Sequence, residues 1–253
     1  MLGPRAPSAT MPDVSELPSR SVVSVSAASG APVLAPESIA SAYGKGLVSA
    51  TATAQDTPLP TILGGTSLIL KDSAGVERKA PLFFVSPTQV NSLVPAGTAS
   101  GLATIQIGDL SGTAEISAVA PAVFSANQTG QGVAVGSAVR VRADGSQTIA
   151  PVFQCGSSPA SCVSVPIDLG PSSDQVALVL YGTGLRGRSS LSNVTCTVGA
   201  VSAPVLFADA QGGFVGLDQV NLLLPRSLAG SGEVPVTLVV DGMPSNAVTV
   251  SIK

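Results

Sequence analysis

Apolar and polar residues alternate in short runs along most of this chain, which is the pattern of strands with one buried face. The clearest case is VTLVVDGMPSNAVTV (236–250), where two alternating runs meet at Asp241-Gly242, a dipeptide typical of hairpin turns. The stretch ATIQIGDLSGTAEIS (103–117) repeats this arrangement around a glycine-containing turn. No segment keeps a helical period between capping residues. The pattern therefore predicts an all-β fold of many short strands, typical of β-sandwiches.

The chain also contains internal repeats. The motif Gln-Val-Asn-x-x-x-Pro occurs in PTQVNSLVP (87–95) and again in LDQVNLLLP (217–225). Before each copy, SAYGKGLV corresponds to VLYGTGLR and APLFFVSP corresponds to APVLFADA, and after each copy lies a pair of alternating runs. Because these features recur in one order, we expect two copies of one β-sandwich module, the first over 21–119 and the second over 175–253.

The segment between the two copies, residues 120–174, is too long for a simple linker. Its run VAVGSAVRVRADGSQTIAP alternates and contains the hairpin signal Asp144-Gly145. We therefore expect a connecting β-rich insert that packs between the modules or extends one of their sheets.

Two of the three cysteines lie close together in this insert. Cys155 and Cys162 bracket CGSSPASC, a loop of turn-forming residues, which suits a local disulfide in an oxidising compartment. Two free thiols and a metal site are the alternatives, although the chain has no His to complete a metal site. Cys196 stands alone in an expected strand, and we interpret it as a small buried apolar residue.

The N-terminal part has two sections. Residues 1–20 are rich in Pro and Ser and are expected to form a flexible tail. The apolar stretch SVVSVSAAS that follows is either the first strand of the first module or an extended arm that adds to the sheet of a neighbouring subunit. In the second case Ser21, Val22, Val23 and Val25 would supply the donor strand.

The repeated Gln-Val-Asn motif places two amides on one side of a strand. Because strand side chains alternate, Gln89 and Asn91 in the first copy, and Gln219 and Asn221 in the second, are predicted to face away from the core. We expect their amides to bond to the backbone of an adjacent loop, such as the bend in YGKGL or YGTGL. A ligand-binding role is the alternative, since such a pair can also hold a sugar or a peptide.

Each of these bends begins with a tyrosine. Tyr43 opens YGKGL and Tyr181 opens YGTGL, so the two occupy matching positions. We expect each ring to fill the core of its module, with the hydroxyl bonded nearby.

The charge content narrows the classes of partner. Charged residues make up 11% of the chain, the net charge is −3, and no cluster of Lys or Arg is present, which argues against binding to nucleic acid. No apolar run is long enough for a membrane helix, so no membrane span is expected. The first 20 residues contain no apolar core of a signal peptide, which suggests a processed chain or a fragment of a longer product.

The sequence offers little for catalysis. Without His, neither a Ser-His-Asp triad nor a Cys-His pair can form, and most of the 15 Asp and Glu residues occupy turns. We expect no enzyme activity and no cofactor. Calcium is the one ion considered, with Asp209 and Asp218 as candidate ligands, although no EF-hand loop is present.

Several stretches together resemble a bacterial family, the C-terminal extracellular domain of large secreted proteins in Solibacter-type acidobacteria. They are SAASGAPVLAPESIASAYGKGL, TPLPTILGGTSLIL, APLFFVSPTQVNSLVP, APAVFSANQTGQG, VALVLYGTGL, GFVGLDQVNLLLP and SNAVTVSIK. The resemblance spans Val22–Lys253. It implies paired Ig-like folds of the IPT/TIG kind, a secreted location, and a structural or adhesive role without assigned catalytic residues.

These observations combine into two functional expectations. The first is a secreted, non-enzymatic structural or adhesion protein at the cell surface or outside the cell, with self-association or extracellular-matrix contacts, and with filament assembly by β-strand addition as one form. Members of the family usually follow a larger domain, and its absence here favours a self-standing subunit. The second is a carbohydrate- or ligand-binding accessory module of a larger secreted protein.

Overall fold

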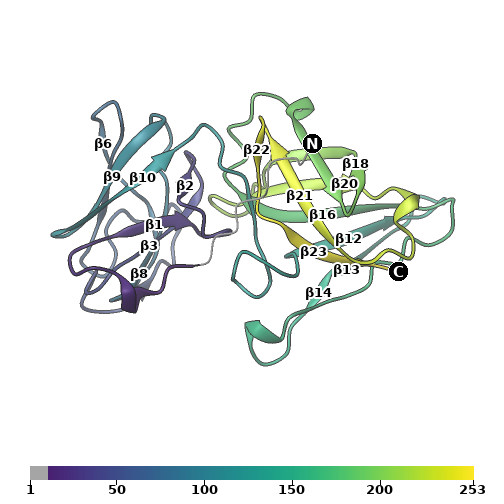
Figure 1. Ribbon diagram of the computed structural model, residues 1–253, viewed down its shortest axis with the longest axis horizontal. Coiled ribbons are helices and arrows are strands. Elements are labelled where there is room, and N and C mark those ends of the chain that lie inside the picture. Colours follow the sequence, from purple (N-terminus) through teal and green to yellow (C-terminus); the bar gives the residue numbers. More distant parts are fainter. Residues whose placement is uncertain (1–10) are drawn as a thin grey trace.

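The structure is a computed structural model and describes residues 11–253. Strands dominate it and gather into two β-sandwiches arranged along the long axis of the molecule (Figure 1). The described helices are single 3₁₀ turns: η1 (Val14–Glu16), η2 (Pro159–Ser161), η3 (Leu191–Asn193) and η4 (Arg226–Leu228). The prediction of an all-β fold is confirmed. Residues 1–10 of the expected tail lie outside the described residues.

The first sandwich consists of two five-stranded sheets. One has the order β1 (Val23–Ser26), β3 (Ile39–Tyr43), β8 (Gln89–Leu93), β7 (Leu82–Val85), β4 (Ala52–Thr53). The other has the order β2 (Val33–Leu34), β10 (Leu110–Ile116), β9 (Gly101–Ile107), β5 (Leu68–Lys71), β6 (Glu77–Lys79). Inward-facing apolar side chains of both sheets, such as Leu70, Leu82 and Ile105, form one buried core between them.

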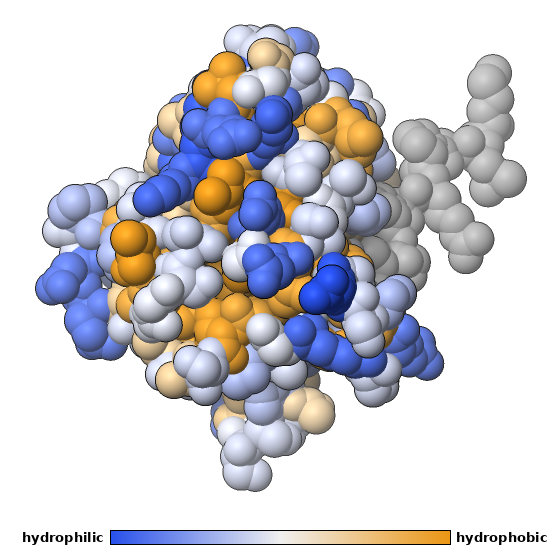
Figure 2. Space-filling model, turned by 90° about the vertical axis from the view of Figure 1, so that its left-hand side faces the viewer, coloured by the Kyte–Doolittle hydropathy of each residue, from blue (hydrophilic) through white to orange (hydrophobic). Residues whose placement is uncertain are grey.

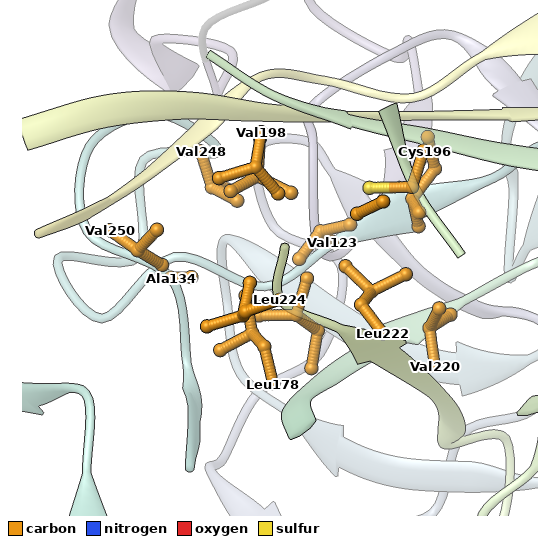
Figure 3. Close-up of a cluster of buried hydrophobic side chains, with 14 of the residues drawn as sticks. Val123, Ala134, Leu178, Cys196, Val198, Val220, Leu222, Leu224, Val248 and Val250 are labelled. Carbon is orange, nitrogen blue, oxygen red and sulfur yellow. The ribbon is translucent and has the colours of Figure 1, made fainter. Parts of the chain in front are cut away.

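The second sandwich is larger. One sheet has the order β13 (Gln147–Pro151), β12 (Gly136–Val141), β16 (Gln175–Thr183), β20 (Asp218–Leu223), β19 (Val205–Ala210), and β11 (Ala122–Val123) also pairs with β16. The other has the order β18 (Val201–Ala203), β17 (Val194–Val198), β21 (Gly232–Val240), β22 (Met243–Pro244), and β23 (Val248–Ile252) also pairs with β21. Figure 3 shows the core between them, where Val198 and Val248 face Leu178. A separate two-stranded hairpin is formed by β14 (Phe153–Gln154) and β15 (Val163–Ser164).

Strands of the segment between the two copies belong to the second sandwich. β12 pairs with β16 from Gly136 opposite Leu180 to Val141 opposite Gln175, so this segment extends one sheet. Asn246, which is buried, fixes the start of the segment. Its Oδ1 accepts from the Val123 N–H at 2.8 Å, and its Nδ2 donates to the Val123 carbonyl at 2.8 Å and to the Gly130 carbonyl at 2.7 Å.

The two copies share the register of their strands as well as their sequence. Tyr43 lies opposite Gln89 in the pairing of β3 with β8, and Tyr181 lies opposite Gln219 in the pairing of β16 with β20. The next strand contains a register shift at the same place in both copies, between Leu82 and Phe84 in β7 and between Val205 and Phe207 in β19. The sequence repeat is therefore a repeat of tertiary structure.

The candidate donor strand is placed within its own first sandwich. β1 pairs antiparallel with β3, from Val23 opposite Tyr43 to Ser26 opposite Ala40. The Val22 N–H donates to the Ser111 carbonyl at 3.0 Å. At Gly112 a Cβ atom would stand 1.8 Å from the Val22 carbonyl oxygen, so only glycine admits this approach. In this chain Ser21, Val22, Val23 and Val25 thus take the first of the two expected roles, the opening strand of the first sandwich.

The surface of the first sandwich contains scattered apolar residues. Figure 2 views the end of the molecule formed by this sandwich, where hydrophobic residues lie in patches between hydrophilic ones. The large apolar side chains exposed on this sandwich are Ile62, Val76 and Leu102. Isolated residues of this kind are normal on soluble domains and need no partner.

Candidate ligand-binding cleft at the junction of the two sandwiches

A cleft of about 370 Å³ lies between the outward face of β3 and β8 and the segment 124–128 of the second sandwich. Ala27, Ala28 and Met11 close its sides. No charged side chain is among the described lining residues, and the polar ones carry hydroxyl and amide groups: Ser41, Tyr43, Gln89, Asn91, Ser125 and Gln128. The cleft therefore presents neutral hydrogen-bonding groups beside the ring of Phe124.

The first-copy amides are organised by one shared acceptor. Asn91 Oδ1 accepts from Gln89 Nε2 at 2.8 Å and from Ser41 Oγ at 2.9 Å. Among the described residues, these bonds leave the Asn91 Nδ2 hydrogens and the Gln89 Oε1 atom without a protein partner. A donor and an acceptor side by side can bind a hydroxyl pair or a peptide group.

The second copy has the same amide pair, which does not line this cleft. Gln219 Nε2 donates to Asn221 Oδ1 at 2.9 Å. The strand position that carries Ser41 in the first copy carries Val179 here, so the hydroxyl donor is missing. The expectation that the amides bond to an adjacent loop is wrong in both copies, because side chains two positions apart on a strand lie on one face and reach each other first.

The residue before each glutamine accepts a hydrogen bond from the bend in YGKGL or YGTGL instead. Thr88 accepts through its backbone carbonyl from the Gly44 N–H at 3.2 Å. In the second copy Asp218 accepts through Oδ2 from the Leu185 N–H at 2.9 Å. The bend is therefore bonded to the residue before each glutamine and not to the predicted amides.

The tyrosines do not fill the cores, so that expectation is corrected. Tyr43 is half-buried, lines the cleft, and directs its hydroxyl to Met11 Sδ at 3.7 Å. Tyr181 is also half-buried and is not part of the core of the second sandwich. Each stands opposite a glutamine, on the face turned away from the core. Burial raises the pKa of the Tyr43 hydroxyl above its ordinary value.

The bend in YGTGL also forms the junction between the sandwiches. Thr183 Oγ1 accepts from the Ile39 N–H at 2.8 Å and donates to the Gly216 carbonyl at 2.8 Å. Gly216 has φ +75°, and a Cβ there would stand 2.7 Å from side-chain carbons of Ile39 and Leu93. The loop that contains Gly216 therefore lies directly against the first sandwich.

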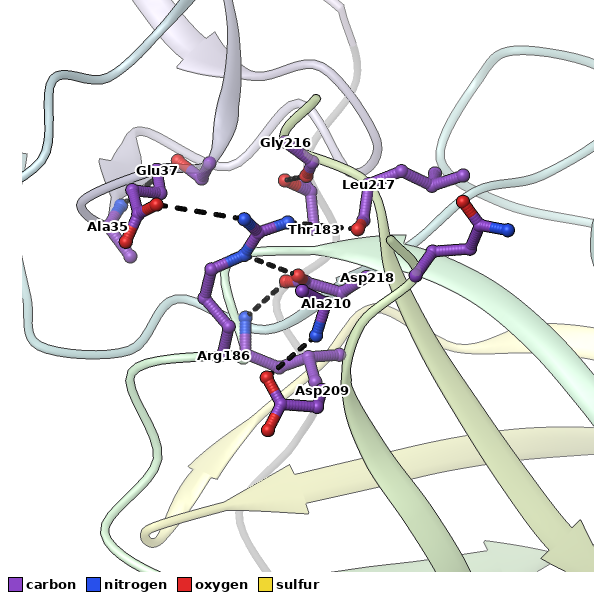
Figure 4. A network of polar contacts seen from close by, with 12 residues as sticks. Ala35, Glu37, Thr183, Arg186, Asp209, Ala210, Gly216, Leu217 and Asp218 are labelled. Atoms are coloured by element: carbon purple, nitrogen blue, oxygen red, sulfur yellow. Dashed lines mark hydrogen bonds and ion pairs between the residues drawn. The ribbon is translucent and has the colours of Figure 1, made fainter. Parts of the chain in front are cut away.

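A buried ion pair stands beside this contact (Figure 4). Arg186 Nε lies 2.7 Å from Asp218 Oδ1, and its NH2 group donates to the Leu217 carbonyl at 2.9 Å. Its NH1 group reaches across the junction to Glu37 of the first sandwich at 3.8 Å. The Asp218 side chain is fully buried, and burial raises the pKa of its carboxyl although Arg186 acts in the opposite direction.

The two carboxylates considered for calcium are both paired with arginine. Asp218 is held by Arg186, and Asp209 Oδ2 lies 3.0 Å from Arg188 NH1. Over residues 11–253 no group of three or more His, Cys, Asp or Glu side chains could hold a metal ion.

The cysteine prediction is confirmed. Cys155 and Cys162 form a disulfide that closes the loop between β14 and β15. Cys196 is a buried free thiol that packs in the core of the second sandwich. Burial raises the pKa of the Cys196 thiol to about 12.

Comparisons with known proteins add no family. No protein-family model matches the chain, and no curated protein matches it. Among the described residues, no helix has the length and apolar character needed to cross a membrane.

Proposed function

We propose that this chain is a secreted, non-enzymatic structural or adhesion protein built from two Ig-like modules, as in the acidobacterial family that its sequence resembles. The observation that carries the proposal is the junction. Thr183 and Arg186 of the second sandwich bond directly to Ile39 and Glu37 of the first, so the two sandwiches are joined by specific contacts. A pair joined in this way holds its surfaces at a defined spacing, which is what a structural or adhesive role requires.

Two further features support the proposal: one concerns the extracellular location and the other concerns self-association. Cys155 and Cys162 form a disulfide, and bonds of this kind persist in oxidising compartments and are rare in the cytosol. Charged residues make up only 11% of the chain, which leaves surfaces that associate laterally rather than repel one another.

The location is tested in the organism that produces the protein. The chain should be recovered from the medium or the cell surface, accessible to added protease, with Cys155 and Cys162 oxidised. Recovery from the cytosol with both thiols reduced would overturn the proposal. Light scattering and negative-stain electron microscopy of the same material test self-association, and a monomer in both would remove the filament form.

A second candidate function is favoured by the cleft. A ligand-binding accessory module would use the free Asn91 and Gln89 groups beside Phe124 to bind a neutral, hydroxyl-rich ligand such as a glycan. Binding on a glycan panel should be lost in Asn91→Ala. The matched control is Asn221→Ala, which removes the equivalent amide in the second copy, outside the lining of the cleft. Equal loss in both variants, or no binding by the parent chain, would contradict this function.

A further inference from the structure

Strand β13 forms an outer edge of the larger sheet of the second sandwich, beside β12 (Figure 1). All five of its residues are exposed and none is charged. Ile149 at its centre has an exposed fraction of 72%. An exposed apolar edge of this kind is a template for pairing with another strand.

The other described edges are shorter, buried or charged. β6 consists of Glu77, Arg78 and Lys79, and β1 has three of its four residues buried. β19 contains a register shift, and its Asp209 carries a charge. The strands β2, β4, β11, β14, β15, β18 and β22 have two or three residues each. The five-residue strand β23 pairs with β21 on one side, and on its other side its backbone bonds to Gly132, Ala134 and Ile167. Charges, bulges and short length all hinder edge-to-edge pairing, so β13 is the edge that lacks protection.

The hydrogen bonds at its two ends show which backbone groups of β13 point outward. The Arg142 N–H donates to the Ser146 carbonyl at 2.9 Å, and the Val152 N–H donates to the Gly136 carbonyl at 3.3 Å. In an antiparallel ladder, bonded and non-bonded pairs alternate.

Every second residue of β13 therefore bonds to β12, and starting from Ser146 or from Val152 identifies the same residues. Thr148 and Ala150 bond to β12, opposite Arg140 and Ala138. The backbone groups of Gln147, Ile149 and Pro151 therefore point away from the sheet.

We propose that β13 pairs antiparallel with β13 of a second copy, about a two-fold axis at Ile149. The two Ile149 residues exchange two N–H···O=C bonds, and the Gln147 N–H of each copy donates to the Pro151 carbonyl of the other. Only the Gln147 carbonyl stays unpaired, because Pro151 has no N–H to offer it. This inference deepens the proposed self-association and rests on it.

Packing and charge agree with this register. Ile149 lies on the outward face next to Val139, so pairing would bring the two Ile149 side chains together. β13 itself contains no charged residue, so no like charges would meet along the paired strands. A two-fold contact of this kind closes on itself, so it gives a dimer, and a filament would need a second contact elsewhere.

The first test measures mass by light scattering over a series of protein concentrations. Edge pairing buries less surface than the roughly 1,200 Å² of a stable complex, so the parent chain should show a concentration-dependent dimer. Ile149→Lys places two like charges opposite each other at the axis and should abolish the dimer. Leu102→Lys is the control, because Leu102 is 62% exposed on a strand that is not an edge, and it should leave the dimer intact.

The second test uses disulfide cross-linking to determine the register of the two β13 strands. Paired residues that exchange two bonds have Cα atoms about 5.5 Å apart, within the range of a disulfide. Ile149→Cys should therefore cross-link two copies under mild oxidation, and Leu102→Cys should not.

The outcomes separate this inference from the broader proposal. Self-association that survives Ile149→Lys without cross-linking of Ile149→Cys would overturn β13 as the contact and leave self-association standing. A parent chain that is monomeric at every concentration would overturn both. Equal unfolding midpoints of the parent chain and Ile149→Lys would show that the variant is folded.

Discussion

Arg186 and Asp218 form a buried ion pair, 2.7 Å apart, at the point where the two sandwiches meet. Both stand at positions where the two copies of the repeat differ, since the first copy has Val48 and Thr88 there. Thr183, which also bonds across the junction, replaces Lys45. The shared residues thus build the two sandwiches, and the differing residues join them.

Removing the Arg186 side chain should lower the stability of the fold. In Arg186→Met the Asp218 carboxylate stays buried without its cation, which lowers the free energy of unfolding by about 3 kcal/mol. Urea unfolding at neutral pH measures the change. The control is Lys71→Met, which breaks the exposed pair with Glu77 and should cost less than about 1 kcal/mol. Equal losses in the two variants would contradict a buried role for Arg186.

Asp72 should make the fold sensitive to acid. Backbone N–H groups of Ala99 and Val76 and the Arg78 guanidinium hold the pKa of its carboxyl at about 2, below the ordinary 3.8. Because the folded pKa is the lower one, the stabilisation is complete above pH 3.8 and is lost as the pH falls from 3.8 to about 2.

The variant Asp72→Asn tests this effect. It should be less stable at neutral pH, and its stability should change less over that interval, as measured by urea unfolding at a series of pH values. Asp218 acts with the opposite sign, because burial raises the pKa of its carboxyl: its contribution is most favourable below pH 3.8 and is lost as the pH rises above 3.8 through the raised folded pKa. An unchanged acid profile in Asp72→Asn would contradict the assignment.

Asn246 should be essential for fixing the segment that enters the second sandwich. Asn246→Ala leaves the buried N–H and carbonyl of Val123 without partners and should lower the free energy of unfolding by about 3 kcal/mol. Thermal unfolding and hydrogen exchange of the Val123 amide measure the effect. The exposed Asn193→Ala should cost about 0.5 kcal/mol or less. A similar loss for both would show that burial of Asn246 is not what matters.

The cysteines should differ in reactivity. In the native chain without reductant, no thiol should react with a thiol reagent, because Cys196 is buried with a pKa of about 12 and the others form a disulfide. Unfolding should release one reactive thiol, and unfolding with reduction should release three. Labelling of Cys196 in the native chain would contradict its burial.

The sequence predicted those features whose causes are local. Alternation and turn residues identified the strands and hairpins, and the short spacing of Cys155 and Cys162 identified the disulfide. The faces of Gln89 and Asn91 also followed from the strand period of two. The hydrogen-bond partners of these two side chains could not be predicted, because the strand period shows which face a side chain lies on but not which residues lie next to that face.

The same limit explains why the tyrosine rings, which were expected in the cores of the sandwiches, lie outside them. Tyr43 is the last residue of β3 and Tyr181 lies two residues before the end of β16. Both face outward, and only the register opposite Gln89 and Gln219 shows this. The cleft, the Arg186–Asp218 pair and the free edge of β13 are likewise absent from any local pattern.

By itself, then, the sequence determined the strand content, the repeat and the disulfide, because hydrophobic periodicity and turn chemistry act between neighbours in the chain. Only the tertiary structure decided where β12 and β13 pair, how the sandwiches dock and which edge stays open. Those outcomes depend on residues such as Ile39 and Thr183, 144 positions apart, whose contact exists only once both sandwiches have formed.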